Sequence, residues 1–300
     1  MDTERAAGIL LGLACGDALG RPVEFRSAAS IERAHGTVRE MLGHGTHGQP
    51  AGTITDDTEL ALCLARSLVE LSRFDPDDIG QRFVDWLESG PFDVGLMTAD
   101  AIRHIRDGTA PETAGRRVWE ARSEGSNAGN GSVMRCAPHA IAYADHADRL
   151  AEVSERSSTI THADPRCTAG CAVLNLTLAG LARDDADPLT AALDRVDAPG
   201  ELHDALVTLP TRPSTLRSSG YVVHTLQTAL YHGLTAESAE EGIVAAVNMG
   251  EDTDTVGAVT GAVVGARFGA SDLPDRWVET VGHTTELREL GEQLATGTFD

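Results

Sequence analysis

Apolar residues recur at helical spacing in eight segments of the chain, returning every third or fourth position as on one face of an α-helix. These segments span residues 6–19, 60–71, 79–87, 95–105, 169–181, 221–231, 243–248 and 255–268. Alternation typical of strands is scarce, and aromatic residues make up only 4% of the chain, so little of the sequence favours a sheet. The pattern predicts an all-α protein.

Short turn-rich segments separate these helices, for example residues 43–52, 124–131 and 184–187. None resembles a linker, because no stretch is rich in Pro or Ser over ten residues, no repeat stands out and the composition does not shift. A chain of 300 residues can bury a full core in one large domain or two smaller ones. We expect a single domain over residues 1–300.

The charge balance limits the partners of the protein. Asp and Glu number 46 against 24 Lys and Arg, all of them arginine, which gives a net charge of −22. Such a surface repels nucleic acid and anionic membranes, so neither is an expected partner. With 41% hydrophobic residues the chain is still globular, and the acidity suggests a salt-rich cell interior in which screening weakens the self-repulsion.

The cysteines and apolar runs bear on cellular location. The five cysteines are odd in number, contain no Cys-x-x-Cys pair and are expected to be buried thiols in a reducing compartment. Cys167 and Cys171 are four residues apart, but without a His at ligand spacing core packing is favoured over metal binding. No leader peptide opens the chain, and no apolar run approaches the roughly 20 residues of a membrane span. We expect a soluble, cytoplasmic protein.

Two acidic clusters stand immediately before apolar helices. Residues 55–59 read Thr-Asp-Asp-Thr-Glu, and taken alone they indicate a helix N-cap at Asp56 with Glu59 as its capping-box partner. Residues 250–255 read Gly-Glu-Asp-Thr-Asp-Thr and again place two carboxylates and threonine hydroxyls at a helix start. One cap needs one oxygen, so the surplus of carboxylates indicates a cation site.

If the two helix starts face each other, they form an all-oxygen pocket with four negative charges. Hard divalent ions suit such ligands, and bridging carboxylates could hold two of them roughly 3.5–4 Å apart. We therefore expect two divalent cations, Mg²⁺ or Mn²⁺, rather than zinc, which prefers nitrogen and sulfur ligands. The candidate ligands are Thr55, Asp56, Asp57, Asp252, Asp254 and Thr255.

Further polar residues lie close to the predicted helix ends. The segment Gly12–Gly20 carries glycines that allow close helix approach, while Asp17 within it and Glu24 after it are either structurally paired or functional. Residues 126–135 form a small-residue loop suited to phosphate oxygens, although an ordinary flexible loop is equally compatible. For His44 and His47, in a glycine-rich loop, a ligand role is disfavoured.

Six motifs in this order resemble the ADP-ribosylglycohydrolase family, closest to the branch that removes ADP-ribose from arginine. They are GDALG with Glu24, TDDTEL, PFDVG, GNGSVMR, THADP and GEDTDTVGA. The resemblance implies an all-α orthogonal helical bundle with a dinuclear Mg²⁺ or Mn²⁺ centre held by the six ligands named above. It also implies that Glu24 touches a metal or gates the cleft, and that Asp93 is a candidate general acid or base.

The same resemblance assigns the substrate side of the site. His162 and the loop from Ser126 through Met134 would hold ADP-ribose, and Glu124 and Tyr221 would lie near the arginine. The loop residues concerned are Ser126, Asn127, Ala128, Gly129, Asn130, Gly131 and Met134. Relatives run Asp-x-Gly-Asn-Thr where this chain reads Asp-Val-Gly-Leu-Met-Thr over residues 93–98, so the acceptor side differs. Arginine remains the first choice of linkage, ahead of serine and O-acetyl-ADP-ribose.

Two other functions use the same residues. A two-metal phosphoesterase would need a cationic phosphate clamp, for which Arg135 is the nearby candidate. A non-catalytic ADP-ribose-binding protein would not need four acids in one pocket. The expected partner is an ADP-ribosylated protein or a small ADP-ribosyl conjugate, and the chain is expected to be a monomer.

Overall fold

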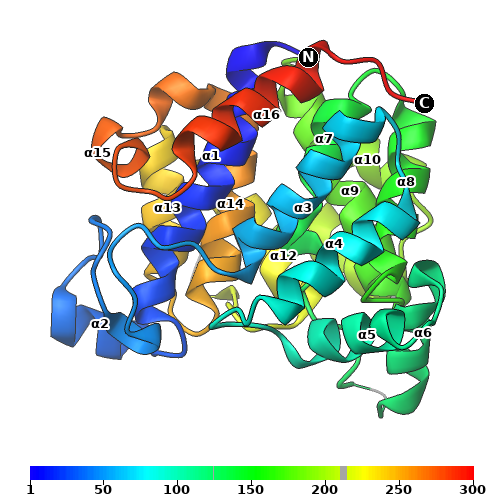
Figure 1. The fold of residues 1–300 in the computed structure, drawn as a ribbon. Coiled ribbons are helices and arrows are strands. Elements are labelled where there is room, and N and C mark those ends of the chain that lie inside the picture. The colour runs from blue at the N-terminus through cyan, green and yellow to red at the C-terminus, as the bar shows by residue number, and fades with distance from the viewer. Residues whose placement is uncertain (124, 210–214) are drawn as a thin grey trace.

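The computed structural model describes residues 1–123, 125–209 and 215–300, and its regular elements are helices (Figure 1). Within these ranges no strand forms, and β-pairing is limited to isolated bridges such as that between Gly129 and Tyr221. The all-α prediction is therefore confirmed. The helices are α1 Thr3–Gly20, α2 Ala28–His35, α3 Asp56–Leu71, α4 Pro76–Glu88, α5 Leu96–Arg106, α6 Pro111–Ala121, α7 Pro138–Ala142, α8 Ala147–Thr159, α9 Pro165–Leu181, α10 Pro188–Arg195, α11 Gly200–Val207, α12 Val222–Thr235, α13 Ala239–Val247, α14 Thr253–Phe268, α15 Asp275–Val278 and α16 Thr284–Thr296.

Helices α1 and α14 pack with their backbones in contact near the centre of the bundle, as Figure 1 shows for the blue and orange helices. A Cβ atom built on Gly12 would lie 2.1 Å from the Gly261 carbonyl oxygen, and one on Gly16 would lie 1.9 Å from that of Gly257. Only glycine permits this approach. Because the pairing is antiparallel, the C-terminal end of α1 lies beside the N-terminal end of α14.

The helices of the core are apolar on every side, which is typical of buried helices. All side chains from Thr253 to Ala266 in α14 are buried, as are those from Ala6 to Gly20 in α1. Contrary to the sequence expectation, one described helix, extended over Thr3–Val23, is long and apolar enough by length and composition to cross a membrane. Its apolar window is completely buried inside the protein, as in a core helix.

All eight predicted helices are present, and the helices that the periodicity missed are short or predominantly polar. Helix α8, for example, buries Leu150 and Val153 on one side and carries charged residues elsewhere. The five cysteines are free and buried, as expected. Three of their thiols donate to the loop that precedes α7: Cys167 to the Gly129 carbonyl, Cys136 to Val133 and Cys171 to the Ser132 hydroxyl.

Candidate active site

The site begins where α1 meets the start of α3. Asp17, completely buried near the end of α1, accepts hydrogen bonds from the backbone N–H groups of Thr55 at 3.0 Å and Thr58 at 3.3 Å, and from the Thr58 hydroxyl at 2.5 Å. Asp17 thereby satisfies the N–H group of the N-cap residue and that of one residue in the first turn of α3. Asp17 thus has a structural role, one of the two roles left open by the sequence.

The N-cap of α3 is Thr55, not Asp56. The Thr55 hydroxyl accepts from the Asp57 N–H at 3.3 Å, whereas Glu59 accepts from the Trp86 indole N–H at 2.6 Å and forms no capping box. The expected cap at Asp56 is therefore wrong, because Thr55 already fills that position. The Asp56 carboxylate instead accepts from the Gly95 N–H at 3.3 Å.

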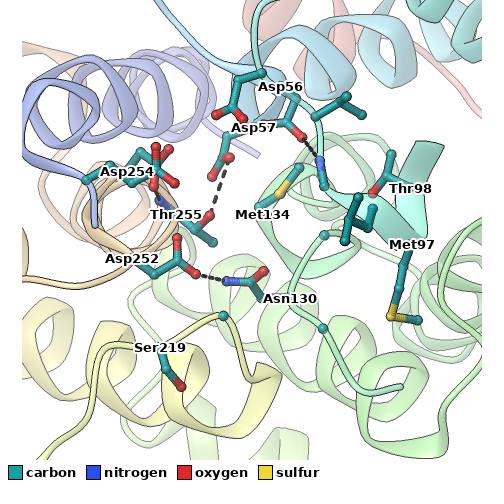
Figure 2. A pocket seen from close by; sticks show the side chains of 18 of the residues that line it. Asp56, Asp57, Met97, Thr98, Asn130, Met134, Ser219, Asp252, Asp254 and Thr255 are labelled. Carbon is teal, nitrogen blue, oxygen red and sulfur yellow. Dashed lines mark hydrogen bonds between the residues drawn. The ribbon is translucent and has the colours of Figure 1, made fainter. Parts of the chain in front are cut away.

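The second acidic cluster faces the first, so the condition on which the sequence argument for a shared pocket depended is met. The Thr255 hydroxyl donates to Asp57 Oδ2 at 3.4 Å, across a gap of 198 residues in sequence, and the Thr55 hydroxyl donates to the same oxygen at 3.3 Å. Asp252 precedes α14 and accepts from the Asn130 side-chain amide at 2.7 Å. Figure 2 shows Asp57, Asp252, Asp254 and Thr255 turned toward one another.

Glu24 and Asp93 meet through a histidine. His47 Nε2 lies 2.5 Å from Glu24 Oε2 and 3.7 Å from Asp93 Oδ2. The loop that carries His47 is organised by the buried guanidinium of Arg21, which donates to the backbone carbonyls of Leu42, His44, Gln49, Pro50 and Thr53. His47 was disfavoured by the sequence, which offered no sign that Arg21 folds this loop over Glu24.

These residues line a cavity of about 490 Å³, which is within the range of small-molecule sites. Carboxylates occupy one side and Met97 and Thr98 the other, as seen in Figure 2. The predicted residues that line the cavity are Glu24, Asp56, Asp57, Asp93, Gly129, Asn130, Gly131, Met134, His162, Asp252, Asp254 and Thr255. Thr55 lies just beneath it, bonded to Asp57.

The remaining predicted substrate residues do not line this cavity. Ser126 is exposed and bonds to Ser123, while Asn127 and Ala128 are buried in the loop behind Gly129. Tyr221 accepts from Arg166 at 3.0 Å, and its neighbours Ser219 and Gly220 line the cavity instead. Glu124 lies outside the described residues.

His162 is buried at the wall of the cavity. Its Nδ1 lies 2.8 Å from the Thr161 hydroxyl, and its Nε2 lies 3.3 Å from the position of a Cβ on Gly129. Burial, followed by the charge of Arg135, lowers the pKa of His162 to about 3, so the imidazole is neutral at pH 7. A neutral ring can donate or accept one hydrogen bond toward a ligand in the cavity.

The carboxylates are strongly perturbed. Burial and then the charge of Asp93 raise the pKa of Asp56 to about 8 and that of Glu24 to about 9. Burial raises the pKa of Asp57 and of Asp254 well above the ordinary range, with neighbouring carboxylates adding to the effect. Such a group of acids favours either shared protons or a compensating cation.

The donor set fits divalent cations. Asp57 Oδ1 is buried and has no hydrogen-bond partner in the described structure, although its other oxygen has two. Oxygens of Glu24, Asp252 and Asp254 lie within 4.8 Å of one another, close enough to hold one ion. Carboxylate and hydroxyl oxygens are ligands that Mg²⁺ and Mn²⁺ accept. Glu24 therefore joins the ligand candidates.

Arg135 is not placed to clamp a phosphate in the cavity. Its guanidinium is buried, donates to the Gly131 carbonyl and lies 5.0 Å from the centre of the Phe83 ring. None of the described residues that line the cavity is an arginine. The arginine instead supports the loop 129–134 from behind.

Comparison with known proteins agrees with these observations. The chain is 35% identical to ADP-ribosyl-[dinitrogen reductase] glycohydrolase of Rhodospirillum rubrum, over 97% of this chain and 94% of that protein. It is 33% identical to ADP-ribosylarginine hydrolase Tri1 of Pseudomonas putida, over 97% of this chain and 78% of that protein. A solved structure described as an ADP-ribosylglycohydrolase-related protein complex superposes with a TM-score of 0.84 at 33% identity, covering 98% of this chain and 97% of that one.

The family-wide pattern covers almost the entire chain, matching residues 1–299. The helical fold, the facing acidic helix starts and the relatives all lead to the same assignment. The protein belongs to the ADP-ribosylglycohydrolase family, as its motifs indicated.

Proposed function

We propose that the protein is a hydrolase that uses two divalent cations, Mg²⁺ or Mn²⁺, to cleave the glycosidic bond between ADP-ribose and an arginine side chain of a modified protein. The observation that carries this proposal is the junction of the two helix starts at Asp57, where one carboxylate oxygen bridges both clusters and the other is buried without a partner. The arginine linkage is supported by the relative from P. putida, which is named an ADP-ribosylarginine hydrolase, and the modified protein as substrate by the relative from R. rubrum.

Different side chains of the cavity would bind the ADP-ribose and the cations. His162, Asn130 and Gly131 line one wall, where a neutral imidazole and a narrow glycine turn suit the ADP-ribose part. Asp57, Asp254 and their neighbours would hold the cations, which supply Lewis acidity and orient ribose hydroxyls and water. The carboxylates also favour the positive charge that develops on the sugar in an oxocarbenium-like transition state.

Glu24 and Asp93 are the proposed proton-transfer groups. Both line the cavity and both contact His47, whose ring keeps the two carboxylates in fixed positions relative to each other. Burial raises the pKa of Glu24 to about 9 and raises that of Asp93 above its ordinary value, so both carboxyls hold a proton more firmly than an exposed carboxyl does. One of them deprotonates the attacking water or protonates the departing acceptor.

The alternatives receive less support. A phosphoesterase would need a cationic clamp, and Arg135, the candidate from the sequence, points into the core. A non-catalytic protein would have no use for a buried carboxylate oxygen without a partner. We further propose that the protein is a single-domain monomer and that it acts in the cytoplasm, a reducing compartment to which its five free, buried thiols are suited.

The test is release of free ADP-ribose from an arginine-ADP-ribosylated protein, with Mn²⁺ or Mg²⁺ and with chelator. Serine-linked ADP-ribose and O-acetyl-ADP-ribose are run beside it. We expect metal-dependent release from the arginine substrate, and a phosphodiester substrate should not be cleaved. Release from only the serine-linked or the O-acetyl substrate would show that the acceptor is not arginine. No release from any substrate would refute the proposal that the protein is a hydrolase.

A further inference from the structure

Two exposed apolar side chains line the cavity, and a third lies beside the histidine that contacts Glu24. In the described part of the chain, four large hydrophobic residues are exposed: Phe25 at 70%, Leu96 at 75%, Val207 at 50% and Phe92 at 38%. Phe25 and Leu96 line the cavity itself, and the Phe92 ring lies 5.5 Å from that of His47. We call Phe25, Phe92 and Leu96 the apolar rim.

The backbone holds Phe25 in an unfavourable conformation. Phe25 has a φ of +61° and Glu251, beside it, has a φ of +63°, a region that residues other than glycine adopt infrequently. The Phe25 N–H donates to the Glu251 carbonyl at 2.7 Å, and the Glu251 N–H donates to the Arg26 carbonyl at 2.7 Å. The fold thus holds a large aromatic ring in solvent, which costs free energy both through backbone strain and through the exposure of apolar surface. Backbone strain of this kind is concentrated at functional sites.

The position of the rim indicates what would cover it. The rim is continuous with the candidate active site but lies at its solvent end, whereas the carboxylates that would act on the sugar are buried. A small conjugate such as O-acetyl-ADP-ribose has little apolar surface beyond the sugar. A polypeptide acceptor carries side chains on both sides of the modified residue, which reach past the cavity mouth.

The charges around the rim select among polypeptides. Asp93 adjoins Phe92, and the exposed Glu251 adjoins Phe25, so the mouth is acidic as well as apolar. A flanking sequence rich in Asp or Glu would be repelled, both here and by the net charge of −22. Apolar and uncharged or basic flanks are complementary.

We propose that the apolar rim is a docking surface for the acceptor polypeptide, on which apolar side chains flanking the ADP-ribosylated arginine pack. The inference rests on the proposed function and makes a modified protein, not a small conjugate, the preferred substrate.

The test compares kcat/KM for three substrates: free ADP-ribosylarginine, an ADP-ribosylated peptide with leucines flanking the arginine, and the same peptide with aspartates. Phe25→Asn and Leu96→Ser are made singly and together, because Asn tolerates a positive φ better than other non-glycine residues. Val207→Ser is the control, a change at an exposed apolar residue on α11 that does not line the cavity. Melting temperatures verify that each variant is folded.

We expect wild-type protein to prefer the leucine-flanked peptide over both other substrates. The double variant should lose this preference over free ADP-ribosylarginine by about tenfold, mainly through a higher KM for the peptide, and Val207→Ser should retain it. Equal losses on peptide and free ADP-ribosylarginine, or no loss on either, would overturn the docking role. A wild-type protein that cleaves neither arginine substrate would refute the proposed function, and this inference with it.

Discussion

Asp57 joins the two halves of the candidate site within a single side chain. One oxygen accepts from Thr55 and Thr255, and the other is buried without a partner among the described residues. A carboxylate left in that state costs free energy unless a proton or a cation compensates it. Asp57 is therefore explained by the chemistry of the site and not by the stability of α3, in whose first turn it lies.

Substitution of the proposed proton-transfer acids should remove turnover without unfolding the protein. Because positioned acid–base groups contribute typically about 10²–10⁴-fold, we expect Glu24→Ala or Asp93→Ala to lower kcat by at least about a hundredfold. Steady-state release of ADP-ribose measures this, with Glu32→Ala on the exposed side of α2 as the control. Wild-type rates in both site variants would contradict the assignment.

The raised carboxyl pKa values predict how stability of the metal-free protein depends on pH. Asp56 and Glu24 have folded-state pKa values of about 8 and about 9, above their ordinary values, so the folded state holds protons that the unfolded chain releases. Their contribution is complete at low pH and is lost as pH rises through those values. The pKa of His162 is lowered to about 3, so below about pH 7 the unfolded chain binds a proton that the folded protein does not, and this residue makes stability rise with pH there.

We therefore expect the melting temperature of chelated protein to fall between about pH 7 and pH 8.5. Millimolar Mg²⁺ or Mn²⁺ should reduce this fall, because the ions bind the ionised carboxylates. Thermal melts with and without chelator check both statements. A melting temperature that rises over this window in chelator, or an unchanged slope with metal, would contradict the electrostatic description.

Without the family resemblance, which pointed to Glu24, Asp93 and His162, site residues could be predicted only where the sequence held more acids and hydroxyls than helix capping needs. Six acidic and hydroxyl residues in two clusters exceeded what helix capping requires, and the structure brings those clusters together. His47 showed no such excess, because its position depends on Arg21 gathering the carbonyls of a glycine-rich loop. The Asp56 cap was misassigned because Thr55, one residue earlier, satisfies the same N–H groups.

At the scale of elements, the contact between α1 and α14 sets the geometry of the site. Asp17 lies near the end of α1, and Asp252 and Asp254 lie at the start of α14, so the spacing of these helices fixes the distances among the acids. The spacing depends on glycines that meet backbone to backbone. Glycines that carry no functional group therefore help to set the geometry of the acidic site.

A methyl group at this contact should disturb both folding and activity. In Gly12→Ala the new Cβ would lie 2.1 Å from the Gly261 carbonyl oxygen, so the helices must separate. We expect destabilisation of about 1–3 kcal/mol and a lower metal affinity, since overpacking in a core is costly. Denaturant unfolding and metal titration are the measurements.

Gly200→Ala is the matched control for this experiment. A Cβ on Gly200, in the first turn of α11, has nothing within 4 Å and needs no positive φ. It should leave stability and metal affinity close to wild type. If the Gly12→Ala protein were as stable as the Gly200→Ala protein and bound metal with the same affinity, the contact between α1 and α14 would not determine stability or metal binding.

The elements themselves could be predicted to different degrees. Helices such as α1 and α14 have long apolar runs and were found with their approximate ends. Helices α6 and α16 were missed because a few small or aliphatic residues on one side are enough to hold them against the bundle. The glycines of α1 indicated a close contact with another helix. They did not indicate that this helix is α14, because the spacing of glycines in one helix does not identify its partner.

At the scale of the whole molecule, the net charge of −22 acts on every folded conformation. Ion pairs such as Arg82 with Asp78 and Glu70 place some positive charge beside the carboxylates at the surface, but these arginines are already counted in the net charge. The repulsion among the carboxylates is long-ranged in 0.1 M salt, where the Debye length is about 10 Å. In 1 M salt the Debye length is about 3 Å, and the repulsion is short-ranged. The salt-rich cell interior suggested by the composition therefore implies that the folded protein is more stable at high salt concentration.

We expect the melting temperature to rise by several degrees between 0.1 M and 2 M NaCl, because screening relieves repulsion in the compact state more than in the extended chain. One cooperative calorimetric transition is also expected if residues 1–300 form one domain. Calorimetry at both salt concentrations checks the two statements. A lower melting temperature at 2 M NaCl, or two separate transitions, would contradict them.

The most direct test measures bound Mn²⁺ and ADP-ribose release on the same samples of wild-type and Asp57→Asn protein. We predict two Mn²⁺ ions per wild-type chain and release from an arginine-ADP-ribosylated protein in proportion to the metal bound. Asp57→Asn, which preserves the size of the side chain but removes its charge, should lose both while remaining folded. Undiminished release by Asp57→Asn, or release by wild type that chelation does not affect, would contradict the metal-dependent hydrolase.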